Sequence, residues 1–178
     1  MEYVFPLQAT EFLESLEWKT DLFESEAGKE EARKVRDVPR QIFSLTAYAG
    51  KDDTQLAYNL LYSGLSSQWG VPVWSEAQAA GSIPVSSTIA YVETANRDFR
   101  VGSLAIAWES PSKYQVLTVN DIGTGYITFD EASIGFTNAQ FMPLRIGRIL
   151  QEPKRAFNGS DLYLTIKFQI EDVLLLDP

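Results

Sequence analysis

Short polar pairs are the first candidates for chemistry in this chain: Asp52-Asp53, Asn120-Asp121 and Asp130-Glu131. Glycoside cleavage needs two carboxylates that face one cleft about 5 to 9 Å apart. Adjacent residues of a strand instead point to opposite faces, and acids in turns point to water. The spacing around Asp121 and Asp130 also matches no EF-hand calcium loop. We therefore expect no enzyme activity, no bound metal and no cofactor.

The composition excludes most other catalytic chemistry. The chain has no His and no Cys, so neither a Ser-His-Asp triad nor a Cys-His pair can be built. Zinc sites, iron–sulfur clusters and disulfides are disfavoured for the same reason. The formal net charge is −9, which repels phosphate groups on average. A protein that binds free nucleic acid is therefore not expected.

A locally basic stretch, residues 25–40, interrupts this acidic chain. Within it, the acids Glu26, Glu30, Glu31 and Asp37 are outnumbered by basic residues. The basic residues are Lys29, Arg33, Lys34, Arg36 and Arg40. Two interpretations remain open for the stretch: a solvated loop, or a long hairpin loop or arm.

The four tryptophans divide into two groups by their local pattern. Trp18 and Trp108 lie in alternating segments that are typical of strands, which predicts core positions. Trp69 and Trp74 flank Pro72, which cannot donate a backbone hydrogen bond and therefore indicates an edge strand or an irregular connection. Either these two tryptophans fill the core, or they contact a ligand or partner.

Hydrophobic periodicity predicts a mainly β protein with one flanking α-helix. The helix is expected over residues 53–67, where leucines recur at a helical spacing. Alternating or β-favouring segments predict strands at Leu16–Phe23, Gln41–Ala49, Ile83–Val92, Pro143–Leu150 and Leu162–Ile170. The length of 178 residues suits one domain, or one domain with a small inserted subdomain.

The inserted subdomain is expected at residues 93–139. Segments around Ser103–Glu109, Lys113–Asn120 and Tyr126–Phe129 are joined by two short turns and predict a β-meander. Residues 1–92 and 140–178 then form the main β domain.

Met1–Thr10 has no basic region followed by a long apolar run, so no secretory signal is expected, and no apolar stretch is long enough to span a membrane.

Several motifs in a fixed order resemble a known family. They are Trp18-Lys19-Thr20-Asp21, the series Glu24, Gly28, Glu30, Arg33 and Arg36, Pro39-Arg40, Trp69-x-Val71-Pro72-x-Trp74, Asp98-Phe99-Arg100-x-Gly102, and Trp108 before Tyr114. In this order they resemble tail-tip minor tail proteins of long-tailed bacteriophages, in the neighbourhood of the distal tail protein. The resemblance runs over most of the chain, to about residue 170.

The resemblance implies a virion structural protein without catalysis or cofactor. It implies a tail-tube-like β-sandwich or barrel with a flanking helix, assembled in the host cytoplasm into a ring, typically sixfold. The implied partners are further copies of the chain, the tail tube protein, the hub and the tape measure protein. DNA would pass only as cargo, and no membrane is involved. The alternative is a carbohydrate- or receptor-binding β module of the tail.

A ring subunit needs edges or arms that contact its neighbours, and the charge pattern offers one such contact. The basic stretch 25–40 could meet acidic surface on the next subunit, for example around Glu11, Glu14 and Glu17. Complementary charge of this kind sets register and orientation more than affinity. Net acidity also suits a DNA conduit, because carboxylates repel phosphates and let the genome slide.

Overall fold

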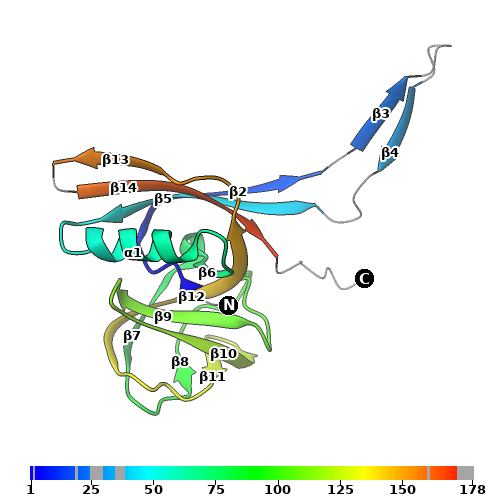
Figure 1. Ribbon diagram of the computed structural model, residues 1–178. Coiled ribbons are helices and arrows are strands. Elements are labelled where there is room, and N and C mark those ends of the chain that lie inside the picture. Colours follow the sequence, from blue (N-terminus) through cyan, green and yellow to red (C-terminus); the bar gives the residue numbers. More distant parts are fainter. Residues whose placement is uncertain (2, 19, 25–29, 35–38, 160, 172–178) are drawn as a thin grey trace.

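The computed structural model describes residues 1, 3–18, 20–24, 30–34, 39–159 and 161–171. The described chain is mainly β with a single α-helix, as its periodicity predicts (Figure 1). In chain order the elements are β1 (Tyr3–Val4), β2 (Ala9–Glu17), β3 (Thr20–Glu24), β4 (Glu30–Lys34), β5 (Arg40–Ala49), α1 (Thr54–Gly64), β6 (Trp69–Pro72), the short 3-10 helix η1 (Trp74–Glu76), β7 (Gln78–Ile83), β8 (Ile89–Ala90), β9 (Leu104–Ser110), β10 (Lys113–Gly123), β11 (Tyr126–Phe129), β12 (Phe136–Ile149), β13 (Lys154–Asn158) and β14 (Asp161–Ile170).

The first core lies between α1 and one face of the strands β2, β5 and β14. Every second side chain of β14 is buried, and those buried side chains face the helix residues Ala57 and Leu61. The inward residues of β14 are Leu162, Leu164, Ile166, Phe168 and Ile170. This alternation is the expected signature of a strand with one covered face. We call the face that α1 covers the inner face of this sheet, and the opposite face the outer face.

A second core lies in the lower half of Figure 1, around β7 to β12. The strands β9, β10 and β11 form the expected meander, with β10 antiparallel to both neighbours. The core of this half also includes residues outside the predicted bounds 93–139. They are Ile83, Ala90 and Val92, before residue 93, and Phe141, after residue 139. Strand β8 reaches this half by pairing with β11, and β7 by pairing with β12. The second packing unit therefore extends beyond residues 93–139.

Strand β12 connects the two cores. Its first half pairs with β7 and β9, through positions such as Phe141 with Ala107. Its second half pairs with β6 and then with β14, ending at Ile149 opposite Phe168. One continuous backbone thus supplies hydrogen bonds to both halves of the protein, which ties their orientations together.

A buried arginine lies on the second half of β12. Arg145 is 2% exposed, and its guanidinium forms an ion pair with Asp98 while also donating to the Asp98 backbone carbonyl. Arg100 donates to the same carboxylate at 2.6 Å, and the Asp98 amide donates to Glu76 at 2.9 Å. A buried cation is tolerated only when it is paired in this way. The network fastens the connection before β9 to the strand shared by both cores.

We expect Arg145→Met to lower the free energy of unfolding by about 3 kcal/mol, because it removes a partner of a partly buried carboxylate. Arg100→Met is the matched control: Arg100 contacts the same Asp98 but is about one-third exposed, so its loss is expected to cost about 1 kcal/mol or less. Urea unfolding of the two variants measures both values. Equal losses would contradict a special role for the buried arginine.

Candidate interaction surfaces

Of the polar pairs considered for chemistry, the structure brings two together, because the Asn120 side-chain amide donates to the Asp130 carboxylate at 3.3 Å. Asp121 and Asp130 lie near the paired strands β10 and β11. Among the described residues, no group of three or more acidic side chains is placed to hold a metal ion. Within that same part of the chain, no helix is long and apolar enough to cross a membrane.

For Trp69, the structure favours the core over the alternative of a ligand or partner contact. Its side chain is 0% exposed, and the indole Nε1 donates to the Gly64 carbonyl at 2.7 Å. Strand β6 is also not an edge at this point, because it runs between β1 and β12. Pro72 is tolerated because β1 pairs only with Trp69 and Gly70. Trp69 is therefore part of the first core.

The remaining tryptophans occupy three different environments. Trp108 is buried, as predicted, and its Nε1 donates to the Pro6 carbonyl at 2.7 Å. Trp74 is half-buried and packs edge-to-face on Trp108, with ring centroids 5.1 Å apart. Trp18 is 60% exposed, so its predicted core position is wrong. The reason is that β2 ends at Glu17, before this residue, rather than running on to Phe23.

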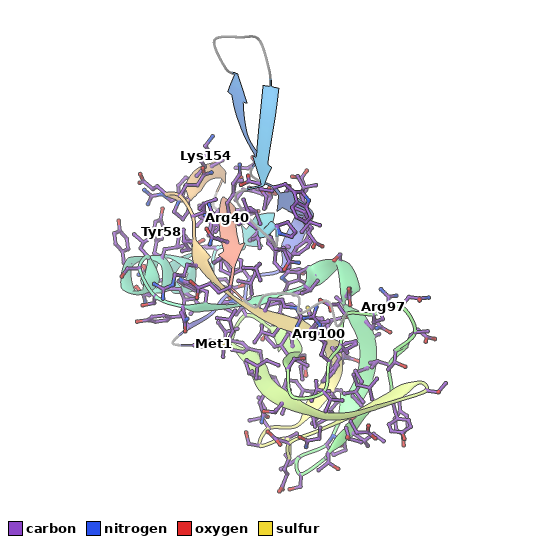
Figure 2. The ribbon with its side chains drawn as sticks, turned by 90° about the vertical axis from the view of Figure 1, so that its right-hand side faces the viewer. Met1, Arg40, Tyr58, Arg97, Arg100 and Lys154 are labelled. Atoms are coloured by element: carbon purple, nitrogen blue, oxygen red, sulfur yellow. The ribbon has the colours of Figure 1, made fainter. Side chains whose placement is uncertain are left out.

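Of the predicted arm, residues 25–40, the structure describes β4, which pairs with the preceding strand β3 in a hairpin that stands away from the body in both views (Figures 1 and 2). Its strands pair with each other and with no other described strand. The flanking strands β2 and β5 also pair antiparallel, from Ala9 with Ala47 to Glu17 with Arg40. The hairpin is thus the outer end of a long ribbon whose root is embedded in the main sheet.

Three of the five predicted arm residues lie among the described residues, on two different strands. Arg33 and Lys34 lie on β4, and Arg40 is the first residue of β5, opposite Glu17. Lys29 and Arg36 lie outside the described residues. The register places Arg33 opposite Asp21. Across the two strands, acids outnumber bases, because β3 contributes Asp21 and Glu24 and β4 contributes Glu30 and Glu31. Basic and acidic positions are therefore interleaved along the hairpin.

One long side of β2 is free of any described partner strand. The exposed residues of this strand include Glu11, Glu14 and Glu17, together with the apolar Leu13 and Leu16. The Glu14 carboxylate accepts a hydrogen bond from Gln41 at 2.6 Å, and Glu11 accepts one from Thr46 at 3.2 Å. These bonds hold the two carboxylates at the margin of the sheet. The acidic surface expected near residues 11–17 is thus an exposed sheet edge.

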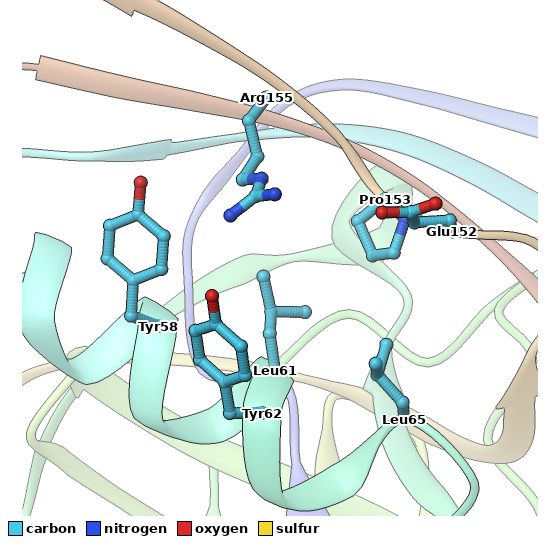
Figure 3. A pocket seen from close by; sticks show the side chains of 7 residues that line it. All are labelled: Tyr58, Leu61, Tyr62, Leu65, Glu152, Pro153 and Arg155. Atoms are coloured by element: carbon cyan, nitrogen blue, oxygen red, sulfur yellow. The ribbon is translucent and has the colours of Figure 1, made fainter.

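A shallow groove between α1 and β13 was not foreseen from the sequence (Figure 3). One helix stripe lines it, Tyr58, Leu61, Tyr62 and Leu65, facing Glu152, Pro153 and Arg155. The Arg155 guanidinium lies over the Tyr58 ring, 5.7 Å from its centroid. The cavity volume is about 80 Å³, far below the roughly 300 to 1,000 Å³ of small-molecule pockets. The 3-4 spacing of the stripe was visible in the sequence, but its partner strand was not.

The altered pKa values have structural causes. The pKa of Glu109 is held below its ordinary value mainly by the backbone N–H of Thr137, with a further contribution from Lys113. Burial raises the pKa of the Tyr114 phenol. Both residues flank the β9–β10 turn, where Lys113 donates to Glu109 at 2.9 Å. These shifts reflect turn packing rather than a catalytic cleft.

A scan against protein-family models finds no match for this chain, and a search of curated proteins finds none either. The surfaces with functional potential are therefore those that the geometry itself presents. They are the projecting hairpin β3–β4, the acidic edge of β2, and the groove beside β13. All three belong to the half of the protein that contains α1.

We expect Trp69→Phe to lower the free energy of unfolding by about 2 kcal/mol, because it removes a buried hydrogen bond and leaves a void. Trp74→Phe is the matched control, since the buried Nε1 of Trp74 has no hydrogen-bond partner in the described chain. Its cost is expected to be about 1 kcal/mol or less. Chemical unfolding of both variants tests this difference, and a larger loss for Trp74→Phe would contradict it.

Proposed function

We propose that this protein is a structural component of a bacteriophage tail tip: a distal tail ring, or an adapter next to it, that joins the tail tube to the hub. In this role it forms a ring of identical subunits, with sixfold symmetry as the expected order. It has no catalytic activity and no cofactor. Its other partners are the tail tube, hub and tape measure proteins, and the assembled ring forms part of the virion.

The projecting hairpin is the observation that carries this proposal. The strands of this hairpin pair only with each other among the described strands, so each has one edge without a described partner strand, and such edges suit pairing with another protein. The root of the ribbon, β2–β5, is held in the first core by residues such as Phe43 and Leu45. The hairpin can therefore reach a neighbour without loss of the fold that supports it.

Charge supports the same role. The chain carries 24 acidic and 15 basic residues. A conduit with net negative charge repels the phosphates of passing DNA and reduces friction along the channel. Glu17, the last residue of β2 and the one nearest the hairpin, also offers an acidic position that basic residues of the hairpin of the next subunit can contact. Such a contact would set the orientation of neighbours more than their affinity.

The alternative of a carbohydrate- or receptor-binding module depended on exposed Trp69 and Trp74. The burial of Trp69 removes one of the two aromatic platforms, and Trp74 packs against Trp108. A sugar needs an accessible aromatic face for stacking. We therefore do not propose this second function.

We expect the double variant Arg33→Glu, Arg36→Glu to block ring assembly while the monomer stays folded, because the hairpin would then repel the acidic surface of its neighbour. Light scattering after size exclusion, with negative-stain images of the same peak, measures the assembled mass and shows whether a central hole is present. Assembly is followed both for the protein alone and with the tail tube and hub proteins.

The control for this experiment is Arg97→Glu, which reverses an exposed charge on the second packing unit, away from the hairpin (Figure 2). This control should assemble like the wild type. Far-ultraviolet circular dichroism checks that each variant is folded. Normal assembly of the Arg33→Glu, Arg36→Glu variant would overturn the role given to the hairpin.

A further inference from the structure

The sheet that carries the hairpin has a second exposed edge. Strand β13 pairs with β14 on one side and with no described strand on the other. All five of its residues are exposed. In the order β2-β5-β14-β13, the strands β2 and β13 therefore lie at opposite margins of one sheet. An exposed edge of this kind is a template for pairing with another chain.

The two edges carry opposite charge. Strand β2 contains Glu11, Glu14 and Glu17 and no basic residue, whereas β13 begins with Lys154 and Arg155 and contains no acid. Within the described part of the chain, neither of these two cations forms an ion pair. The charges on β13 are thus available to a partner.

The acids of β2 and the bases of β13 are also distributed over both the inner and the outer face of the sheet. Glu14 is opposite the core residue Phe43, so it lies on the inner face, and Glu11 is opposite Thr46, on the outer face. On β13, Arg155 is opposite the core residue Leu164, so it too lies on the inner face. Its neighbour Lys154 lies on the outer face, because successive side chains alternate. Each face therefore offers an acid on one edge and a base on the other.

This charge pattern selects one mode of association. Pairing β2 with β2, or β13 with β13, would join two edges of like charge, which is unfavourable. Only β2 against β13 brings opposite charges together. Such a contact joins two different surfaces of one protein, so it is heterologous and can close into a ring.

The groove beside β13 fits the same contact. A strand added to β13 would lie over the gap between β13 and α1, with its inner-face side chains toward the groove residues Tyr58 and Tyr62. Tyr62 is 76% exposed, and Leu16, on the inner face of β2, is 51% exposed. Bringing these apolar surfaces together would remove both from water, which favours the contact.

We propose that the β2 edge of one copy adds to the β13 edge of the next, so that the acidic edge with Glu11 and Glu14 lies along the basic edge with Lys154 and Arg155 and the α1–β13 groove is covered by a second copy of the chain. The inference rests on one part of the proposed function, namely that the chain assembles with itself. It names an interface distinct from the hairpin, formed by sheet extension.

Site-specific cross-linking tests the contact directly, and the cysteine-free chain gives it a clean background. Leu13 and Ala156 lie on the outer face of β2 and β13, and both are exposed. The double variant Leu13→Cys, Ala156→Cys, treated with a short bismaleimide at low salt, should give a ladder of covalent oligomers. The control pair Leu13→Cys, Ser112→Cys, with its second cysteine in the exposed β9–β10 turn, should not.

Charge reversal supplies the second arm of the experiment. We expect Glu11→Lys, Glu14→Lys to weaken self-association at least about tenfold, and Lys154→Glu, Arg155→Glu to do the same, because each brings like charges together. A mixture of the two variants should restore association between them, since each mutant edge now faces its complement. Sedimentation velocity at two salt concentrations measures these changes, and the wild-type contact should weaken as salt rises.

The outcomes separate this inference from the proposed function. If the β2 and β13 variants assemble like the wild type while the Arg33→Glu, Arg36→Glu variant fails, the ring stands and the edge contact is overturned. If the cross-linked ladder and the charge rescue appear but only open chains form, also with the tail tube and hub proteins, the edge contact stands and the closed ring is contradicted. A chain that remains monomeric at high concentration and low salt, without a ladder, overturns the edge contact.

Discussion

The long strand β12 is the constraint on which the rest of the structure depends. Its 14 residues exceed the usual strand length, and they pair in succession with β7, β9, β6 and β14. Because one backbone serves both cores, neither half can shift without breaking ladder hydrogen bonds in the other. The buried Arg145, which lies on this strand and is paired with Asp98, fastens the preceding connection to the same element.

This arrangement leaves the first sheet covered on one face and open at its margins. Helix α1 and the N-terminal residues Phe5 and Leu7 protect the inner face. Strand β12 leaves β14 after Ile149, and β13 takes its place along the remainder of β14. Among the described strands, the sheet therefore presents two unpaired edges, of opposite charge. In the proposed assembly, the contacts between subunits therefore lie at these margins rather than in a cavity.

The proposed role in a phage tail agrees with this distribution. A conduit requires a stable scaffold, contacts that repeat from subunit to subunit, and a surface that does not retain nucleic acid. In the proposed assembly the hairpin and the two edges supply the repeated contacts, and the net charge of −9 disfavours retention of phosphate. Such a role needs no nucleophile and no redox group, which is compatible with a chain that lacks His and Cys.

Local periodicity in the sequence determined the helix near residues 54–64, the strands β5 and β14, and the β9–β11 meander, because each depends on neighbours within a few residues. It also located the basic stretch that contains β4. Tertiary structure alone decided that Trp69 is buried and Trp18 exposed, that β7 and β8 join the second core, and that α1 and β13 form a groove. These features arise from pairings between distant segments, such as β12 with β6, and the energy of those pairings is not encoded in any local pattern.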